Sequence, residues 1–135
     1  MAGETAPELT CPYCQQAAEL AYGVDVIPSR PDLAELPFWV CWRCDARVGC
    51  HPRTNLPLGT LADPRLRRMR GEVHSALDWH WKAARNKGRA RERAYQRLAR
   101  ELSLSPEDCH VGLFDQQQCE LALKVLEGWA REVLG

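Results

Sequence analysis

The pairs Cys11-Pro12-Tyr13-Cys14 and Cys41-Trp42-Arg43-Cys44 decide the fold of the N-terminal part of this chain. Each pair has the C-x2-C spacing that places two thiolates on one metal ion, and two such pairs supply the four ligands of a tetrahedral Zn²⁺ site. The 26 residues between the pairs are enough for a β-hairpin to leave the site and return to it. We therefore predict one structural zinc ion in a zinc ribbon over residues 11–55.

Two other uses of paired cysteines fit this chain less well. A thioredoxin-like redox site has a single C-x-x-C beside a βαβ pattern, which is missing near these pairs. A disulfide framework belongs to secreted chains, but residues 1–10 show no basic start, apolar segment or cleavage site of a secretory signal. No run of about 18 apolar residues is present that would span a membrane. We therefore expect a cytoplasmic protein with reduced thiols and no membrane partner.

Further cysteines and histidines leave alternatives for the ligand set. Cys50 or His51, which closely follow the second pair, can replace one of the four ligands. Cys109, His110 and Cys119 can form a second metal site with Cys50, but their spacing matches no pair of knuckles and packing in a core fits them better. A closed set of four thiolates leaves no open coordination position, so we expect the protein not to be an enzyme.

Strand-like alternation occupies the N-terminal part of the chain, and helical periodicity follows it. Strands are predicted over residues 18–27, 38–40 and 46–49. The predicted fold is α+β, a four-cysteine zinc ribbon with short antiparallel strands followed by three or four helices. The predicted parts are an N-terminal tail (1–10), the zinc ribbon (11–55), a linker (56–62) and a helical domain (63–135).

The helices are predicted from their capping residues and apolar faces. Asp63-Pro64 suits the N-cap and first position of a helix that continues to about residue 80. A second helix begins near Arg89, after a break at Gly88. A third begins at a capping box formed by Asp115 and Gln118 and continues nearly to the C-terminus. Its apolar arc covers about half of the circumference, which indicates two neighbours.

Charge is segregated along the chain. The 18 basic and 18 acidic side chains cancel over the 135 residues. Residues 1–50 carry three basic and seven acidic side chains, residues 51–100 carry thirteen and four, and residues 101–135 carry two and seven. A basic middle segment can attract a polyanion even when the whole-chain charge is zero. The acidic ends can equally cover that segment within the molecule.

An arginine stripe is predicted on the second helix. Arg89, Arg93, Arg97 and Arg100 recur at about one-turn intervals, so they share one face. Guanidinium groups offer planar forks of donors that suit phosphates. Helical basic stripes are also ordinary solvated faces, and no base-reading motif accompanies this one. The arginine stripe is therefore a candidate surface for nucleic acid.

Two tryptophans and one further arginine are candidates for contact with a partner. Arg68, on the first predicted helix, extends the basic field. Trp79 lies on the flank of that helix's apolar face, among polar neighbours. It can stack on a base, dock another protein or cover the ribbon or another helix. Trp42, inside the second cysteine pair, is a further docking candidate.

A series of short motifs in fixed order carries a family resemblance. With these motifs the chain resembles the zinc-finger-containing domain family of unknown function that is common in bacteriophage and prophage genomes. The resemblance implies a small phage protein with an N-terminal zinc finger, acting in a bacterial host cell, and it implies no activity. It spans roughly residues 10–126. The motifs are Cys11 to Cys14, Trp39 to Cys44, Val48 to His51, Pro57 to Asp63, Arg70 to His74, Asp78 to Lys82, Ala94-Tyr95, Leu98-Ala99 and Cys109 to Asp115.

Three classes of function remain. In the first, the protein binds DNA or RNA through the arginine stripe, and zinc only builds the scaffold. In the second, it is a phage-encoded interaction module that docks on a host polymerase, nuclease or defence complex. In the third, it is an enzyme that uses His74, Asp78, His80 or His110, but no nucleophile stands beside a base in the sequence. We favour nucleic-acid binding.

Overall fold

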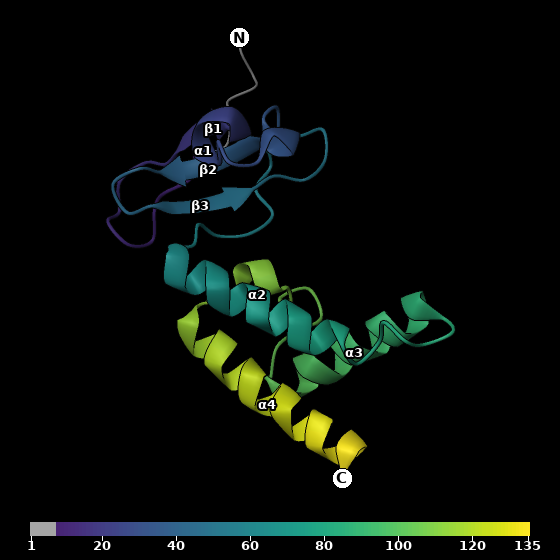
Figure 1. Cartoon of the computed structure of the whole chain (residues 1–135). Helices are drawn as coiled ribbons and strands as arrows, with labels where there is room; N and C mark the ends of the chain where they lie inside the picture. The colour runs from purple at the N-terminus through teal and green to yellow at the C-terminus, as the bar shows by residue number, and fades with distance from the viewer. Residues whose placement is uncertain (1–7) are drawn as a thin grey trace. The chain divides into compact units, whose positions relative to one another are not determined.

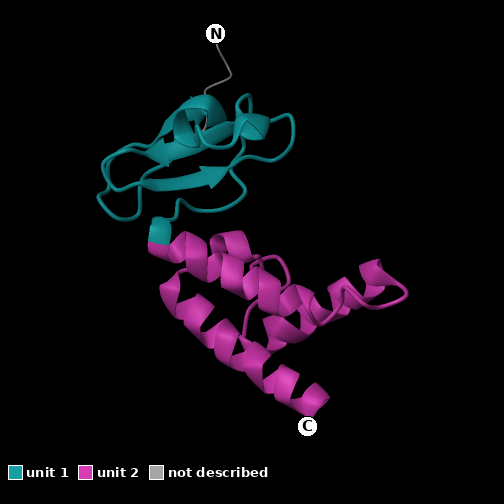
Figure 2. Cartoon of the chain, viewed as in Figure 1, with its two compact units in different colours: residues 1–64 teal, residues 65–135 magenta. Residues whose placement is uncertain are grey.

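The computed structural model describes residues 8–135, which form two compact units (Figures 1 and 2). The first unit covers residues 1–64 and the second covers residues 65–135. Most of the predicted N-terminal tail, residues 1–10, lies outside the described residues. The predicted α+β fold is confirmed, because a three-stranded sheet beside four cysteines precedes the long helices.

The first unit is built on an antiparallel sheet of order β1-β2-β3. The strands are β1 (Glu19–Tyr22), β2 (Pro37–Cys41) and β3 (Ala46–Gly49). The central strand pairs Trp39 with Leu20 on one side and with Val48 on the other. These three side chains belong to one hydrophobic cluster of the unit. The sheet therefore presents an apolar face on which this unit's core is built.

The strand predicted over residues 18–27 is wrong in its second half. The chain leaves β1 at Tyr22 and forms one helical turn, α1 (Gly23–Val26), which is followed by the 3-10 helix η1 (Pro31–Leu33). A Cβ at buried Gly23 would lie 1.9 Å from the carbonyl oxygen of Leu33, so only glycine permits this close approach. The alternation of apolar residues continues past Tyr22 and therefore predicted a longer strand. The strand ends just before Gly23.

Residues 56–62, which were expected as a linker, run beside β3 within the first unit. Arg47 and Ala62 exchange two backbone hydrogen bonds of 3.0 Å, and Leu58 donates its N–H to the carbonyl oxygen of Gly49. Leu61 is 1% exposed and belongs to the same cluster as Trp39. The Trp39 indole N–H donates to the backbone oxygen of Asn55 at 2.7 Å. This segment therefore covers part of the small core of the first unit.

The second unit is helical, and its last two α-helices begin at side-chain caps. The elements are α2 (Pro64–Asp78), α3 (Lys87–Glu101), the 3-10 helix η2 (Val111–Leu113) and α4 (Gln116–Leu134). The predicted capping box is present, because Asp115 accepts from the Gln118 N–H while the Gln118 side chain accepts from the Asp115 N–H. No helix in residues 8–135 has the length and apolar composition that crossing a membrane requires.

The predicted start of the second helix is two residues late. The Asn86 side chain accepts from the Arg89 N–H at 3.0 Å, so the helix begins at Lys87 and Gly88 lies in its first turn. An Asn N-cap satisfies one of the donors that a helix start leaves unpaired. Gly88 therefore does not break the helix, because the cap lies before it.

The core of the second unit is apolar but contains one arginine. Leu77, Leu98, Phe114 and Leu126 are at most 1% exposed. Arg70 is only 8% exposed, and its Nε donates to the backbone oxygen of Phe114 at 2.9 Å. A buried guanidinium requires such an acceptor, because an unpaired buried charge is strongly destabilising. Arg70 is therefore part of the scaffold, although it lies in the most basic third of the chain.

Two leucines on α4 test where the core of the second unit lies. Leu126 is 1% exposed, whereas Leu121 is 48% exposed on the same helix. We expect Leu126→Ala to lower the free energy of unfolding by about 2–5 kcal/mol, because it leaves a cavity. Leu121→Ala should change it by less than about 0.5 kcal/mol. Urea denaturation of both variants, followed by helical circular dichroism, checks this prediction, and equal losses would contradict it.

Candidate metal centre

The first unit brings together the four predicted cysteines from two separate turns. Cys11 and Cys14 lie in the turn before β1, which the Thr10–Ala17 bridge closes. Cys41 ends β2, and Cys44 lies in the turn between β2 and β3. The four Sγ atoms lie within 4.8 Å of one another. Because β2 connects the core to this site, the pairing of the strands positions the second pair of thiols.

Each turn carries the same backbone signature. The residue after the second cysteine of each pair has a left-handed conformation, with φ of 65° at Gln15 and 51° at Asp45. The Gln15 N–H donates to the Cys11 oxygen at 2.9 Å, and the Cys11 N–H donates to the Gln16 oxygen at 2.8 Å. Left-handed residues other than glycine are uncommon and are held by their surroundings. The two turns therefore share a left-handed residue at the same position, and their cysteines supply one cluster of sulfurs.

The distances between the sulfurs fit a shared metal ion and exclude a bond between the two pairs. The Sγ atoms of Cys14 and Cys41 are 3.7 Å apart, and all the cysteines are free. A disulfide would need a separation of about 2.05 Å. Four thiolates at about 2.3 Å from a tetrahedral Zn²⁺ lie roughly 3.8 Å from one another. The donor set therefore fits a closed four-thiolate site.

Electrostatics of the thiols alone explain why this cluster needs a cation. The backbone N–H of Gln16 lowers the pKa of Cys14 to about 7, so this thiol ionises before that of Cys44. Burial raises the pKa of Cys44 to about 12, and the neighbouring thiols of Cys14 and Cys41 add to this shift. Four thiolates cannot coexist at neutral pH without a compensating positive charge. A bound metal ion would supply that charge.

The alternative ligands lie away from the cluster. Among residues 8–135, only the four paired cysteines form a group with metal-binding geometry. Cys50 packs beside the core of the first unit, and His51 is exposed in the loop after it. Cys109 and Cys119 are buried in the second unit, where burial raises the pKa of each thiol. These two cysteines therefore act as small apolar core residues.

Three members of the arginine stripe are exposed on α3, and the fourth, Arg97, forms contacts within the second unit. Arg89, Arg93 and Arg100 are exposed. Arg97 forms ion pairs with Glu132 at 3.0 Å and with Glu101 at 3.5 Å. Its guanidinium also lies over the Trp129 ring, 4.2 Å from the centroid. Arg97 therefore helps to hold α4 against α3, while the other three face solvent.

The remaining predicted binding residues lie on other surfaces. Trp79 is 52% exposed just after α2, where it lines a shallow groove with Arg68 and Leu123. Its ring contacts the His80 ring edge to face, with centroids 5.0 Å apart. Trp42 is 50% exposed in the second cysteine turn of the first unit. Within the second unit, the groove of Arg68 and Trp79 is lined by none of the stripe arginines.

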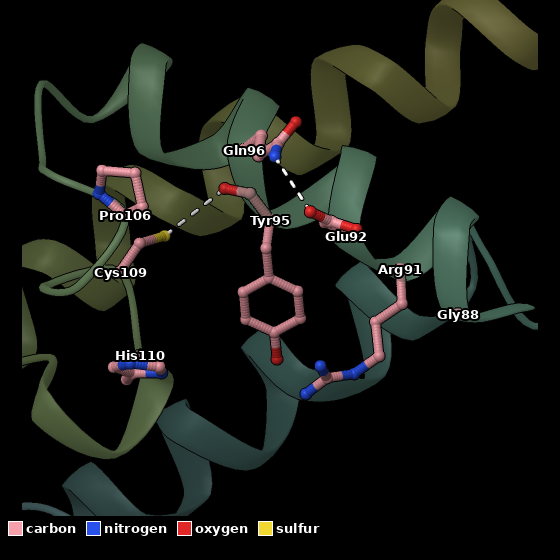
Figure 3. Close-up of a pocket in the computed structure, with 8 residues that line it drawn as sticks. All are labelled: Gly88, Arg91, Glu92, Tyr95, Gln96, Pro106, Cys109 and His110. Carbon is pink, nitrogen blue, oxygen red and sulfur yellow. Dashed lines mark hydrogen bonds between the residues drawn. The ribbon is translucent and has the colours of Figure 1, made fainter.

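A pocket on α3 was not predicted from the sequence. It lies between this helix and residues 106–110, and Figure 3 shows the Tyr95 side chain directed into it. The sequence shows Tyr95 only within a short motif, and His110 only as a candidate for metal binding or catalysis. Their shared pocket depends on the return of the chain after α3. No local sequence pattern predicts that residues 106–110 pack against α3.

Comparison with known proteins identifies the family. The model of the zinc-finger-containing domain family matches residues 8–128. This range spans both units and most of the chain, so the chain belongs to that family. No curated protein and no solved structure gives a significant match. The family description and the four-cysteine cluster together support metal binding by the first unit.

The ligand assignment can be tested with two serine variants of neighbouring cysteines. We expect Cys44→Ser to weaken zinc binding at least a hundredfold, because four ligands share an apparent binding free energy of roughly 10–16 kcal/mol. Cys50→Ser should bind zinc as the unmodified protein does, because Cys50 lies outside the cluster. Competition with a coloured zinc chelator measures both affinities. Equal zinc affinity of Cys44→Ser and Cys50→Ser would disprove the assignment.

Proposed function

We propose that this member of the zinc-finger-containing domain family binds nucleic acid through the arginine stripe on α3. One structural Zn²⁺, held by Cys11, Cys14, Cys41 and Cys44, keeps the first unit folded as a zinc ribbon. In this proposal the protein is a binding protein and not an enzyme. The four thiolates fill the tetrahedral positions of the ion, which leaves none for a substrate.

The exposure of the stripe is the observation that carries the proposal. Arg89, Arg93 and Arg100 have no ion-pair partner within the described part of the chain. They lie opposite the face of α3 that buries Ala94 and Leu98. Unpaired guanidinium groups in a row offer several forks of donors to successive phosphates. A stripe on an ordered helix also needs little rearrangement before it binds.

The distribution of charge between the units supports the same surface. Residues 1–64 carry four basic and eight acidic side chains, whereas residues 65–135 carry fourteen and ten. Within residues 82–100, eight side chains are basic and only Glu92 is acidic. Such a concentration of positive charge accelerates encounter with a polyanion. In this proposal the polyanion is phage or host DNA or RNA in an infected bacterial cell.

Docking on a host protein is the second candidate function. Its support is the shallow groove on the second unit, where Trp79 and Leu123 offer apolar surface and Arg68 and Glu72 add charged groups. Exposed tryptophan beside arginine is common in the centres of protein interfaces. Trp79→Ala should leave nucleic-acid binding unchanged if the arginine stripe carries that function. Loss of nucleic-acid binding in Trp79→Ala would place the binding surface on the groove.

The proposal predicts salt-dependent binding. With three phosphate contacts, the logarithm of the affinity should fall with the logarithm of salt concentration with a slope of about −2 for single strands and about −3 for duplexes. Affinity should therefore fall roughly 20- to 40-fold between about 50 and 200 mM salt. Fluorescence anisotropy of labelled DNA and RNA measures this dependence. Absence of binding at the lower salt concentration would refute the proposal.

Two double variants distinguish binding by the arginine stripe from a general effect of net charge on affinity. We expect Arg89→Glu with Arg93→Glu to abolish binding, because two phosphate contacts become repulsive. Lys124→Glu with Arg131→Glu changes the net charge equally but alters α4, so it should lower affinity much less. Circular dichroism and zinc content should stay unchanged in both variants. Equal loss of affinity in the two variants would reject the stripe.

A further inference from the structure

The pocket beside the arginine stripe has two walls from different segments (Figure 3). Its volume is about 300 Å³, near the lower end of the range for small-molecule sites. One wall is α3, which contributes Arg91, Glu92, Tyr95 and Gln96. The other wall is the segment before η2, with Pro106, Cys109 and His110. This size suits one flat ring system.

Contacts within the second unit hold the walls in place. The Cys109 thiol donates to the backbone oxygen of Tyr95 at 3.7 Å and so ties the second wall to α3. The Arg91 guanidinium lies 4.5 Å from the centroid of the Tyr95 ring and 5.9 Å from that of Trp81. These cation–π contacts fix the orientation of the Tyr95 ring. The aromatic surface is therefore present before a ligand arrives.

The polar groups of the pocket favour an uncharged ring over a phosphate. Arg91 and Glu92 carry opposite charges, so an anion entering the pocket would meet a carboxylate. Burial raises the pKa of the Tyr95 phenol, which keeps this ring neutral. The Gln96 amide donates to Glu92 at 3.4 Å, a long bond that is easily exchanged for another. A nucleobase offers both a stacking face and an edge of donors and acceptors for such groups.

The pocket adjoins the arginine stripe along α3. Gln96 lies one turn from Arg93 and one turn from Arg100, so its side chain projects between the stripe and the pocket. A strand whose phosphates lie on the stripe can therefore turn a base over Gln96 toward Tyr95. A base in a complete duplex is stacked and paired, and it is not available for this contact.

We infer that this pocket receives one unpaired nucleobase, so that the protein prefers single-stranded nucleic acid to a complete duplex. The inference rests on the proposed function, because the stripe provides the contact with the backbone. Tyr95 supplies the stacking surface, and Gln96 with Glu92 contacts the edge of the base. The occupant is a base within a strand, because the exposed arginines of the stripe beside the pocket can bind the phosphates on either side of that base.

The experiment uses the zinc-loaded full chain and oligonucleotides that contain 2-aminopurine, a base whose fluorescence is quenched by stacking. Single-stranded oligonucleotide should bind more tightly than its duplex, and its 2-aminopurine should be quenched on binding. Tyr95→Leu should weaken single-strand binding roughly five- to a hundredfold and abolish the quenching, because it removes one base–aromatic stack. Duplex binding should be unaffected.

Further variants test the pocket in case Tyr95→Leu perturbs folding. Gln96→Ala alters an exposed residue and should reduce single-strand affinity. Gln116→Ala is its matched control, because Gln116 also hydrogen-bonds a glutamate one turn away, but on α4. Tyr95→Phe should retain the quenching. Equal affinities of Gln96→Ala and Gln116→Ala, together with unchanged quenching in Tyr95→Leu, would overturn the inference.

Other outcomes separate this inference from the proposed function. If single strands and duplexes bind equally and only the stripe variants lose affinity, the pocket inference fails and the function stands. If the unmodified protein binds no nucleic acid, both fail. Free 2-aminopurine ribonucleotide is the remaining probe. Quenching of this nucleotide at the concentrations that suffice for the oligonucleotide would assign the pocket to a free nucleotide and overturn the inference.

Discussion

The repulsion among four clustered thiolates, and its relief by a cation, is the interaction on which the first unit depends. Cys11 and Cys41 are not appended to a separate core, because they are themselves buried members of it, together with Trp39 and Leu61. In a unit this small, the apolar core alone supplies little stability. We therefore expect binding of the metal and closure of the core to be one event, as in other small metal-dependent domains.

Local chemistry explains which parts of the fold could be predicted. The spacing of the cysteine pairs and the capping box at Asp115 are complete within a few residues, and both appear in the structure as expected. The end of β1 depends instead on how closely Gly23 passes Leu33, a contact between segments. Residues 56–62 resemble a linker in composition but run beside β3 through backbone hydrogen bonds, which composition does not encode.

The candidate binding surface likewise combines features that local sequence predicts with features that depend on tertiary contacts. Periodicity placed the four arginines of the stripe on one face of a helix. It did not reveal that Arg97 is held by Glu132, 35 residues later, or that Arg70 is buried against Phe114. The pocket around Tyr95 likewise requires residues 106–110 to return to α3. Sequence therefore indicates which charges exist, and tertiary contacts decide which of them are available to a partner.

The double role of Cys11 and Cys41 makes the two units respond to different conditions in the cell. The folded fraction of the first unit depends by mass action on the concentration of free metal. The second unit contains an apolar core of its own around Leu98, Phe114 and Leu126. Metal scarcity, or oxidation of the thiolates, would therefore unfold the ribbon while the helices that carry the arginine stripe stay intact. The supply of metal would then set the fraction of molecules in which both units are folded.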